Sequence, residues 1–83
     1  MTYRVDLTRK AKKQLFDLPP AMRRRVDAVI LRMADDPGRS ARKLVARPGF
    51  RVRVGDYRLL FDVDDEFNIV TVGQILHRRE AYR

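Results

Sequence analysis

The stretch GFRVRVGDYRLLFDV, residues 49–63, decides the fold because it predicts two short strands joined by a Gly-Asp turn at residues 55–56. Glycine at the first turn position is typical of a type II′ turn, whose twist matches the strands that it joins. A two-residue turn also fixes the register and places Arg53 opposite Arg58. The period-two pattern then predicts one apolar face, formed by Phe50, Val52, Val54, Tyr57, Leu59, Phe61 and Val63.

The other face of this hairpin collects three arginines, Arg51, Arg53 and Arg58. Like charges directly opposite each other in a sheet cost roughly 0.2 to 1 kcal/mol per pair, so this face needs a compensating interaction. An anionic ligand would supply one. The alternative is a solvated basic face that discourages pairing with the edges of other sheets. Arg58, which lies opposite Arg53, is poorly suited to that purpose.

The sequence before the hairpin predicts a strand and two helices. Residues 2–7 alternate between apolar and polar, and Thr8 follows as a helix N-cap. A first helix is expected over residues 9–18. The proline pair at residues 19–20 ends that helix and opens a second one, which stops at residues 35–38.

The remaining segments complete one α+β domain over residues 1–83. A polar loop is expected from residue 39 to residue 48, and residues 67–76 predict a last strand with Gly73 as a bulge or close-approach site. The order β-α-α-β-β-β predicts two helices packed on one face of a mainly antiparallel sheet. The arginines must then lie on the other face.

The composition points to a polyanionic partner. The chain has 19 basic and 11 acidic residues, a net charge of +8, and 15 arginines against 4 lysines. The planar fork of arginine binds phosphate bidentately and stacks on bases, which favours nucleic acid. A GC-rich genome would also raise the arginine content, and that alternative stays open.

Other classes of protein are excluded by what the chain lacks. There is no cysteine and only one histidine, so we expect no disulfide, no metal site and no cofactor. No apolar run reaches the roughly 18 residues of a membrane span, and MTYRVDLTRK (residues 1–10) has no apolar signal region. We therefore expect a cytoplasmic protein with no membrane partner.

The tail after the last strand carries groups that can move protons. If it folds back over the sheet, His77, Arg78 and Tyr82 meet the basic hairpin face. Cleaving RNA without a metal needs a base for the 2′-hydroxyl, donors for the charged phosphate oxygens and an acid for the leaving oxygen. The alternatives are that His77 is a capping or surface group and that the Tyr82 ring covers an edge of the core.

The order of the elements, with RVRVGDYRLLF (residues 51–61) and HRREAYR (residues 77–83), resembles the RelE branch of the RelE/ParE toxin superfamily. The similarity runs through essentially all of the chain. The resemblance implies the toxin of a bacterial type II toxin–antitoxin pair. It also implies an endoribonuclease that cuts mRNA in the ribosomal A site by 2′-hydroxyl attack and so inhibits translation.

The resemblance assigns catalytic positions residue by residue. The best-studied pattern has lysines where this chain has Arg51 and Arg53, and arginine, with a pKa above about 12, holds its proton too firmly to be a general base. These two would clamp phosphate, and proton transfer would fall on His77 or Tyr82, with base and acid left open. The full catalytic set is Arg51, Arg53, Arg58, His77, Arg78 and Tyr82.

Other basic residues lie near this set. The arginine run at residues 23–25 lies partly off the apolar stripe of its helix and is interpreted as solvated surface. Two interpretations of the basic loop at residues 39–47 stay open, namely contact with RNA and ordinary solubility. The predicted RNA contacts are Arg42, Lys43, Arg47 and Arg79.

The implied partners are a cognate RelB-like antitoxin, the ribosome and mRNA. Operator DNA is expected as a partner only of the toxin–antitoxin complex. One alternative is a ParE-like inhibitor of DNA gyrase without nuclease activity, and another is a non-catalytic nucleic-acid-binding module. The presence of His77 and Tyr82 in the tail favours the nuclease over the gyrase inhibitor.

Overall fold

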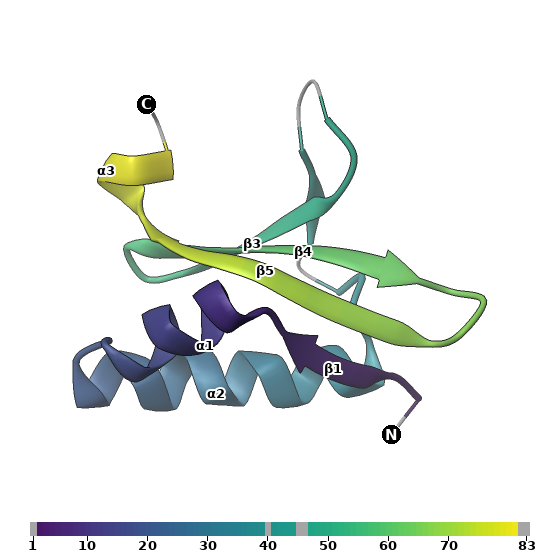
Figure 1. Cartoon of the computed structure of the whole chain (residues 1–83), viewed down its shortest axis with the longest axis horizontal. Helices are drawn as coiled ribbons and strands as arrows, with labels where there is room; N and C mark the ends of the chain where they lie inside the picture. Colours follow the sequence, from purple (N-terminus) through teal and green to yellow (C-terminus); the bar gives the residue numbers. More distant parts are fainter. Residues whose placement is uncertain (1, 40, 45–46, 82–83) are drawn as a thin grey trace.

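The fold is a mixed sheet covered on one face by two helices (Figure 1). The computed structural model describes residues 2–39, 41–44 and 47–81. Its elements in chain order are β1 (Arg4–Leu7), α1 (Arg9–Phe16), α2 (Pro20–Asp35), β2 (Arg42–Lys43), β3 (Phe50–Val54), β4 (Tyr57–Asp64), β5 (Ile69–His77) and α3 (Arg78–Ala81). The five strands lie in the order β1-β5-β4-β3-β2, and only β1 and β5 pair in parallel.

This arrangement confirms the predicted α+β class, and two short elements go beyond the prediction. The segment expected to be wholly a polar loop contains β2, and the tail contains α3. A strand of two residues is too short for an alternating pattern, and α3 is a single turn without helical periodicity. Neither element therefore had a signal in the sequence.

The helical layer begins and ends where local chemistry requires. The backbone N–H of Ala11 donates to Thr8 Oγ1 at 3.1 Å, so Thr8 is the N-cap of α1 as predicted. The first helix ends at Phe16, two residues earlier than expected, because the residue before Pro19 avoids helical geometry. Pro20 then occupies the first turn of α2.

The hairpin has the predicted register, with Arg53 opposite Arg58 and Arg51 opposite Leu60. Gly55 has a φ of +59°, the positive value that the first position of a type II′ turn requires. A Cβ built on Gly55 would lie 2.9 Å from Met22 Cε of α2. Glycine is therefore needed for the turn, and its lack of a side chain leaves room for the tip of Met22.

A β-bulge at Gly73 interrupts β5. Leu60 pairs with Gln74 and Phe61 pairs with Val72, so Gly73 is the extra residue, which confirms the bulge prediction. The hydroxyl of Thr8 donates to the Gly73 carbonyl at 2.9 Å, so the α1 N-cap also holds the bulge. Close by, the Ile75 N–H donates to Gln14 Oε1 at 2.7 Å.

The core lies between the sheet and the helices. Val26 of α2 and three strand residues, Leu59, Val70 and Val72, are completely enclosed. Each such side chain contributes roughly 1.5 to 3 kcal/mol relative to an exposed position. None of the helices in the described part of the chain has the length and apolar character that a membrane span requires.

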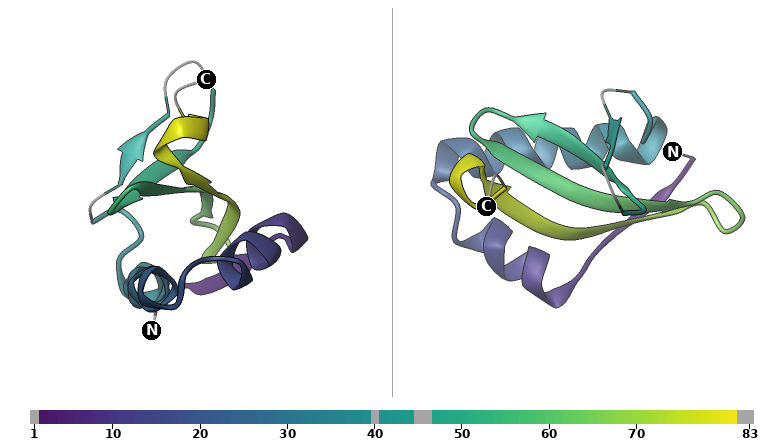
Figure 2. Two further views of the ribbon diagram at one scale, coloured as in Figure 1. Left: turned by 90° about the vertical axis from the view of Figure 1, so that its left-hand side faces the viewer. Right: turned by 90° about the horizontal axis from the view of Figure 1, so that it is seen from above.

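The opposite side of the sheet is left open by the helical layer. In the left view of Figure 2, α3 and the segment around β2 lie on the side of the sheet away from α1 and α2. The sheet face between them is where the hairpin arginines lie.

Candidate active site

Four arginines share the sheet face that α1 and α2 leave uncovered. Arg42 is directly opposite Arg51 across β2 and β3. Arg53 is directly opposite Arg58 across β3 and β4. Opposed residues of an antiparallel pair point to the same side, and with Val52 these side chains line a hollow of about 390 Å³. We call this set the arginine face: Arg42, Arg51, Arg53 and Arg58.

Arg58 is the buried member of the arginine face. It is 4% exposed, whereas Arg51 is half-buried and Arg53 is exposed. It lies on β4, between Arg53 of β3 and Leu76 of β5. A guanidinium stays charged when buried, and removing such a charge from water costs several kcal/mol. The burial of Arg58 argues against the alternative of a merely solvated hairpin face.

The tail brings two further arginines to the same side of the sheet. The backbone N–H of Arg78 donates to the Asp56 carbonyl at 2.7 Å, which ties the start of α3 to the β3–β4 turn. Both Arg78 and Arg79 are exposed. The start of α3 therefore lies at the turn of the basic hairpin.

His77 is not brought into the hollow. It lies opposite Tyr57, and its ring packs edge-on against that ring with centroids 5.1 Å apart. Tyr57 belongs to the helix-facing side of the hairpin, so His77 lies on the other side of the sheet from the arginine face. Its Nδ1 accepts the N–H of Arg79 at 3.2 Å, and its own N–H donates to Glu80 Oε1 at 3.3 Å.

The three remaining predicted residues differ in where they lie. Arg47 lines a neighbouring hollow of about 240 Å³ with Leu60 and Gln74 of the open sheet face. Lys43 is exposed but lies opposite Phe50, so it points away from the arginine face. Tyr82 lies outside the described residues.

Two leucines share the open sheet face with the arginine face. Leu60 lies opposite Arg51, and Leu76 lies opposite Arg58, and both leucines are half-buried. The hairpin pattern contained the signal for Leu60. The position of Leu76 depends on the Gly73 bulge and had no signal of its own.

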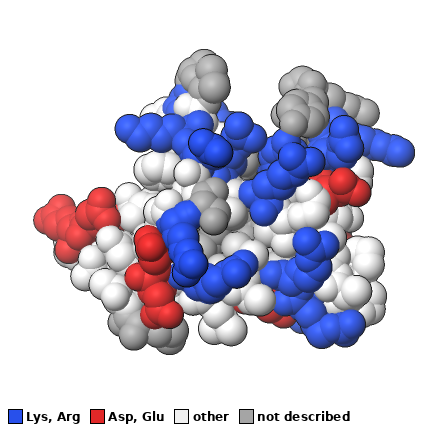
Figure 3. Space-filling view, turned by 180° about the vertical axis from the view of Figure 1, so that it is seen from behind, with Lys and Arg blue, Asp and Glu red and all other residues white. Residues whose placement is uncertain are grey.

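Charge is distributed unevenly over the molecule. Figure 3 shows basic side chains gathered along the upper part, where β2 and α3 lie, with a separate group over the N-terminal part of α2. Acidic side chains gather at the end that carries the β4–β5 turn, where Asp64, Asp65 and Glu66 are exposed. Among the described residues no group of His, Cys, Asp and Glu could hold a metal ion.

The chain matches a known class of small toxins. A family model described as "ParE toxin of type II toxin-antitoxin system, parDE" matches residues 5–82. The chain belongs to the RelE/ParE superfamily of type II toxin–antitoxin toxins. The resemblance noted in the sequence is thereby confirmed.

Individual relatives agree with this assignment. Toxin RelG of Mycobacterium tuberculosis is 34% identical over 91 residues, which cover 100% of this chain and 99% of that protein. The toxin–antitoxin complex RelBE2 of Mycobacterium tuberculosis matches with a TM-score of 0.84 and 32% identity over 94% of this chain and 100% of that chain. The archaeal RelE–RelB complex from Pyrococcus horikoshii OT3 matches with a TM-score of 0.82 and 25% identity over 94% and 97%.

Proposed function

We propose that this toxin is a metal-independent endoribonuclease that cuts mRNA in the ribosomal A site. The observation that carries the proposal is the arginine face, whose four guanidinium groups surround one hollow on the open side of the sheet. Fixed cations of this kind suit a phosphodiester, and they stabilise the charge that gathers on its oxygens during cleavage. The similarity to RelE toxins supports the same reaction.

The proposed reaction begins with attack of the ribose 2′-oxygen on the adjacent phosphorus. A base takes the 2′-hydroxyl proton, the bond from phosphorus to the 5′-oxygen breaks, and an acid gives that oxygen a proton. The products are a 2′,3′-cyclic phosphate and a 5′-hydroxyl. Arg58, already buried and held on the central strand β4, is assigned to the phosphate oxygens, and Arg51, Arg53 and Arg78 are assigned to clamping the RNA.

Proton transfer is assigned to His77 or Tyr82, because arginine is too weak an acid for the task. The contact of His77 with Tyr57 turns its ring away from the hollow. A role as general base or acid therefore requires the α3 tail to move when RNA binds. Tyr82 lies outside the described residues, and the two residues are separated experimentally below.

The ribosome is proposed to orient the RNA. A site without a strong base at its centre depends on precise placement of the 2′-hydroxyl, which a bound A-site codon supplies. The net charge of +8 would hold the toxin on ribosomal RNA. Arg42, Arg47 and Arg79 are assigned to RNA contact.

A RelB-like antitoxin is the proposed partner in the resting cell. Relatives of this chain were crystallised as a RelBE2 complex and as a RelE–RelB complex. An acidic antitoxin segment is complementary to the arginine face, and operator DNA is assigned to the complex only.

The test is primer extension on a defined mRNA, with and without stalled 70S ribosomes. Wild type is expected to cut within the A-site codon only on the ribosome. Arg58→Ala should reduce the cutting rate by about a hundredfold or more, as loss of one oxyanion donor does in other enzymes. Arg24→Ala, at an exposed position of α2, is the matched control and should cut normally. No cutting by wild type under either condition would exclude the proposed reaction.

A second candidate is inhibition of DNA gyrase, which the ParE description of the matching family favours. It is distinguished by a supercoiling assay with purified gyrase. Inhibition of supercoiling by a protein that leaves ribosome-bound mRNA intact would select this candidate.

A further inference from the structure

The hollow that Arg47 lines adjoins the arginine face across one residue. Leu60 of β4 lies opposite Arg51 of β3 on one side and opposite Gln74 of β5 on the other. Leu60 and Gln74 both line the hollow, whose volume is about 240 Å³. Pockets that hold drug-sized ligands begin at about 300 Å³, so this one suits a smaller group. We call it the Arg47 hollow. The lining residues that matter here are Leu44, Leu60, Asp62, Gly73 and Gln74.

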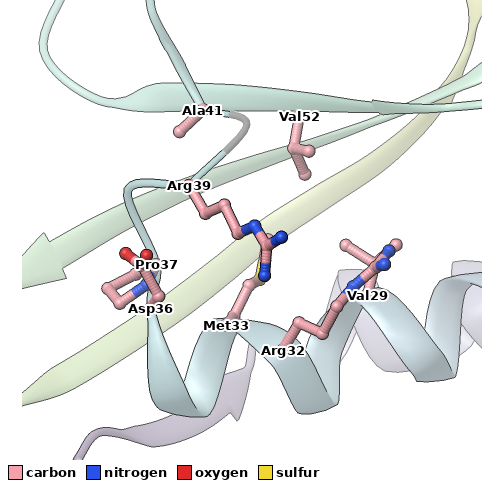
Figure 4. A pocket seen from close by; sticks show the side chains of 8 residues that line it. All are labelled: Val29, Arg32, Met33, Asp36, Pro37, Arg39, Ala41 and Val52. Atoms are coloured by element: carbon pink, nitrogen blue, oxygen red, sulfur yellow. The ribbon is translucent and has the colours of Figure 1, made fainter.

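A different hollow, between α2 and β3, lies on the other side of the sheet (Figure 4). Its volume is about 210 Å³. Figure 4 shows Met33 rising from α2 and Val52 pointing down from β3, with the Arg39 guanidinium between them. Val52 belongs to the apolar, helix-facing side of the hairpin. Of these two hollows, the Arg47 hollow is therefore the one that shares its sheet face with Arg51.

Gly73 keeps the Arg47 hollow open, although the fold does not require glycine there. Its φ lies outside the positive region that Gly49 and Gly55 occupy. A Cβ built on Gly73 would meet the Leu60 carbonyl at 3.8 Å, which is an ordinary contact. Glycine inside a strand often marks a place where a ligand approaches the backbone closely. The absent side chain therefore leaves room for an occupant of the hollow.

Two polar side chains line the Arg47 hollow from neighbouring strands. Asp62 is the second residue after Leu60 on β4 and is exposed, and Gln74 is half-buried on β5. In the described part of the chain, neither side chain makes a hydrogen bond or an ion pair with another residue. A carboxylate only accepts hydrogen bonds, whereas an amide both donates and accepts them. The occupant must therefore donate hydrogen bonds to Asp62, and a phosphate, which is itself negative, is unsuited to the hollow.

A nucleobase with an exocyclic amino group meets these requirements. Its N–H groups can donate to the Asp62 carboxylate and to Gln74 Oε1, and the Gln74 amide can donate to a ring nitrogen or a carbonyl oxygen of the base. Leu44 and Leu60 offer apolar surface to the flat face of the ring. Uracil has no amino group, and its one ring N–H lies between two carbonyl oxygens that the Asp62 carboxylate repels.

We propose that the Arg47 hollow binds a base of an RNA whose phosphate lies on the arginine face, and that it selects bases with an amino group over uracil. Neighbouring strands lie about 4.8 Å apart, so Gln74, two strands away from Arg51, is roughly 10 Å from it, within the reach of one nucleotide. Asp62 and Gln74 are thus specificity-determining residues that take no part in breaking the bond. The choice of RNA as the ligand rests on the proposed function.

The experiment measures the Kd of short fluorescein-labelled RNAs by fluorescence anisotropy. Oligocytidine is compared with oligouridine, and oligoadenosine with an oligomer of purine riboside, which lacks only the amino group. Wild type should bind the amino-bearing member of each pair about tenfold more tightly, the discrimination that a well-placed pair of hydrogen bonds to a base gives. Both members of a pair carry the same charge, so the arginine face contributes equally to the binding of both.

Two variants and a matched control assign this selectivity to the Arg47 hollow. Asp62→Asn keeps the shape of the side chain but can donate to a carbonyl, and Gln74→Met keeps the length but loses the amide. Each should lower the ratio of the two Kd values by about threefold or more. Asp27→Asn removes the same charge from an exposed position of α2, so it should strengthen RNA binding in general and leave the ratio unchanged. Thermal unfolding by circular dichroism checks that the variants are folded.

Equal affinity for the two members of either pair would overturn the proposal, and so would selectivity that Asp62→Asn and Gln74→Met leave unchanged. Binding of none of the four RNAs would overturn it too. These measurements contain no ribosomes and no cutting step, so they are separable from the test of the nuclease. A wild type that binds selectively but cuts no ribosome-bound mRNA refutes the proposed reaction and leaves the base site standing. A wild type that cuts mRNA but shows no selectivity does the reverse.

Discussion

The side chain of Arg58 combines two properties that rarely occur together, near-complete burial and a permanent positive charge. A lysine in the same place could lose its proton and become neutral, whereas arginine cannot. The arginine face is therefore a fixed group of cations. In the proposed reaction its role is to bind and stabilise anions, and the movement of protons must be supplied by other residues.

The assignment of proton transfer is tested at His77 and Tyr82. His77→Gln and Tyr82→Phe should each slow ribosome-dependent cutting, by about a hundredfold for the residue that transfers the proton. The measurement is the single-turnover cutting rate as a function of pH. If both variants cut at the wild-type rate, neither residue handles protons and the mechanism must be abandoned. Because His77 also accepts a backbone bond from Arg79, the pH profile separates a chemical role from a structural one.

Tyr3 gives a pH-dependent contribution to stability far from the arginine face. Its hydroxyl donates to Asp65 Oδ1 at 2.6 Å, and this hydrogen bond, followed by desolvation and the Asp65 and Asp36 charges, raises the pKa of Tyr3 above 10.0. A raised pKa in the folded state stabilises the protein below the unfolded pKa, and this stability is lost as the pH rises through the folded pKa. Tyr3→Phe should therefore be less stable than wild type at neutral pH.

The difference in unfolding free energy between wild type and Tyr3→Phe should shrink as the pH rises above about 10. Urea unfolding at several alkaline pH values measures it, and Asp65→Asn serves as the control for the carboxylate. A difference that stays constant across this range would show that the hydrogen bond to Asp65 does not couple Tyr3 ionisation to folding.

At the scale of elements, one hydroxyl joins the helical layer to the sheet. Thr8 caps α1 and also donates to the Gly73 carbonyl at the bulge. Thr8→Ala should destabilise the protein by about 1 to 3 kcal/mol, the sum of a lost cap and a lost hydrogen bond. Urea unfolding measures this, and Thr8→Ser, which keeps the hydroxyl, should recover most of the loss. If serine and alanine destabilise equally, the two hydrogen bonds are not responsible.

The bulge also explains what the sequence could and could not predict about the site. Thr8, the proline break, the hairpin register and Gly73 itself all follow from local chemistry, and each was predicted from it. The side of the sheet on which His77 lies was not predicted. Val70 and Val72 face the core, and strict alternation would have turned residue 77 to the arginine side. The extra residue at Gly73 reverses the alternation, so Ile75 is buried and His77 lies opposite Tyr57.

At the scale of the whole molecule, the open face is defined by pairings between segments distant in sequence. The sequence predicted two helices on one face of the sheet and three hairpin arginines on the other face. This placed the arginines on the uncovered face, where the structure has them. The hollow between α2 and β3 and the hollow lined by Arg47 could not be predicted from the sequence. The hollow between α2 and β3 depends on β2 ending after two residues, and no local pattern records that length.

The net charge of +8 leads to a prediction about ribosome binding. The logarithm of the binding constant should fall linearly with the logarithm of salt concentration, with a slope of roughly 0.7 to 0.9 for each phosphate contacted. Arg53→Gln should reduce the slope by about one such unit. Arg24→Gln should leave it unchanged, since the arginine run at residues 23–25 is interpreted as solvated. Equal slopes for wild type and Arg53→Gln would remove Arg53 from the RNA contacts.

The pairing of β1 with β5 has a consequence for how the toxin is made. Arg4 lies beside Ile69 and Leu7 beside Val72, so β1 cannot pair until β5, which is synthesised after the other four strands, is available. Translation delivers residues in order, and a sheet that needs β5 cannot close while β5 is still inside the ribosome. The bulge, the seat for α3 and the central position of Arg58 between β3 and β5 all depend on that closure. Under the proposed function, a nascent chain whose β5 is still inside the ribosome lacks a complete site and cannot attack the ribosome that is producing it.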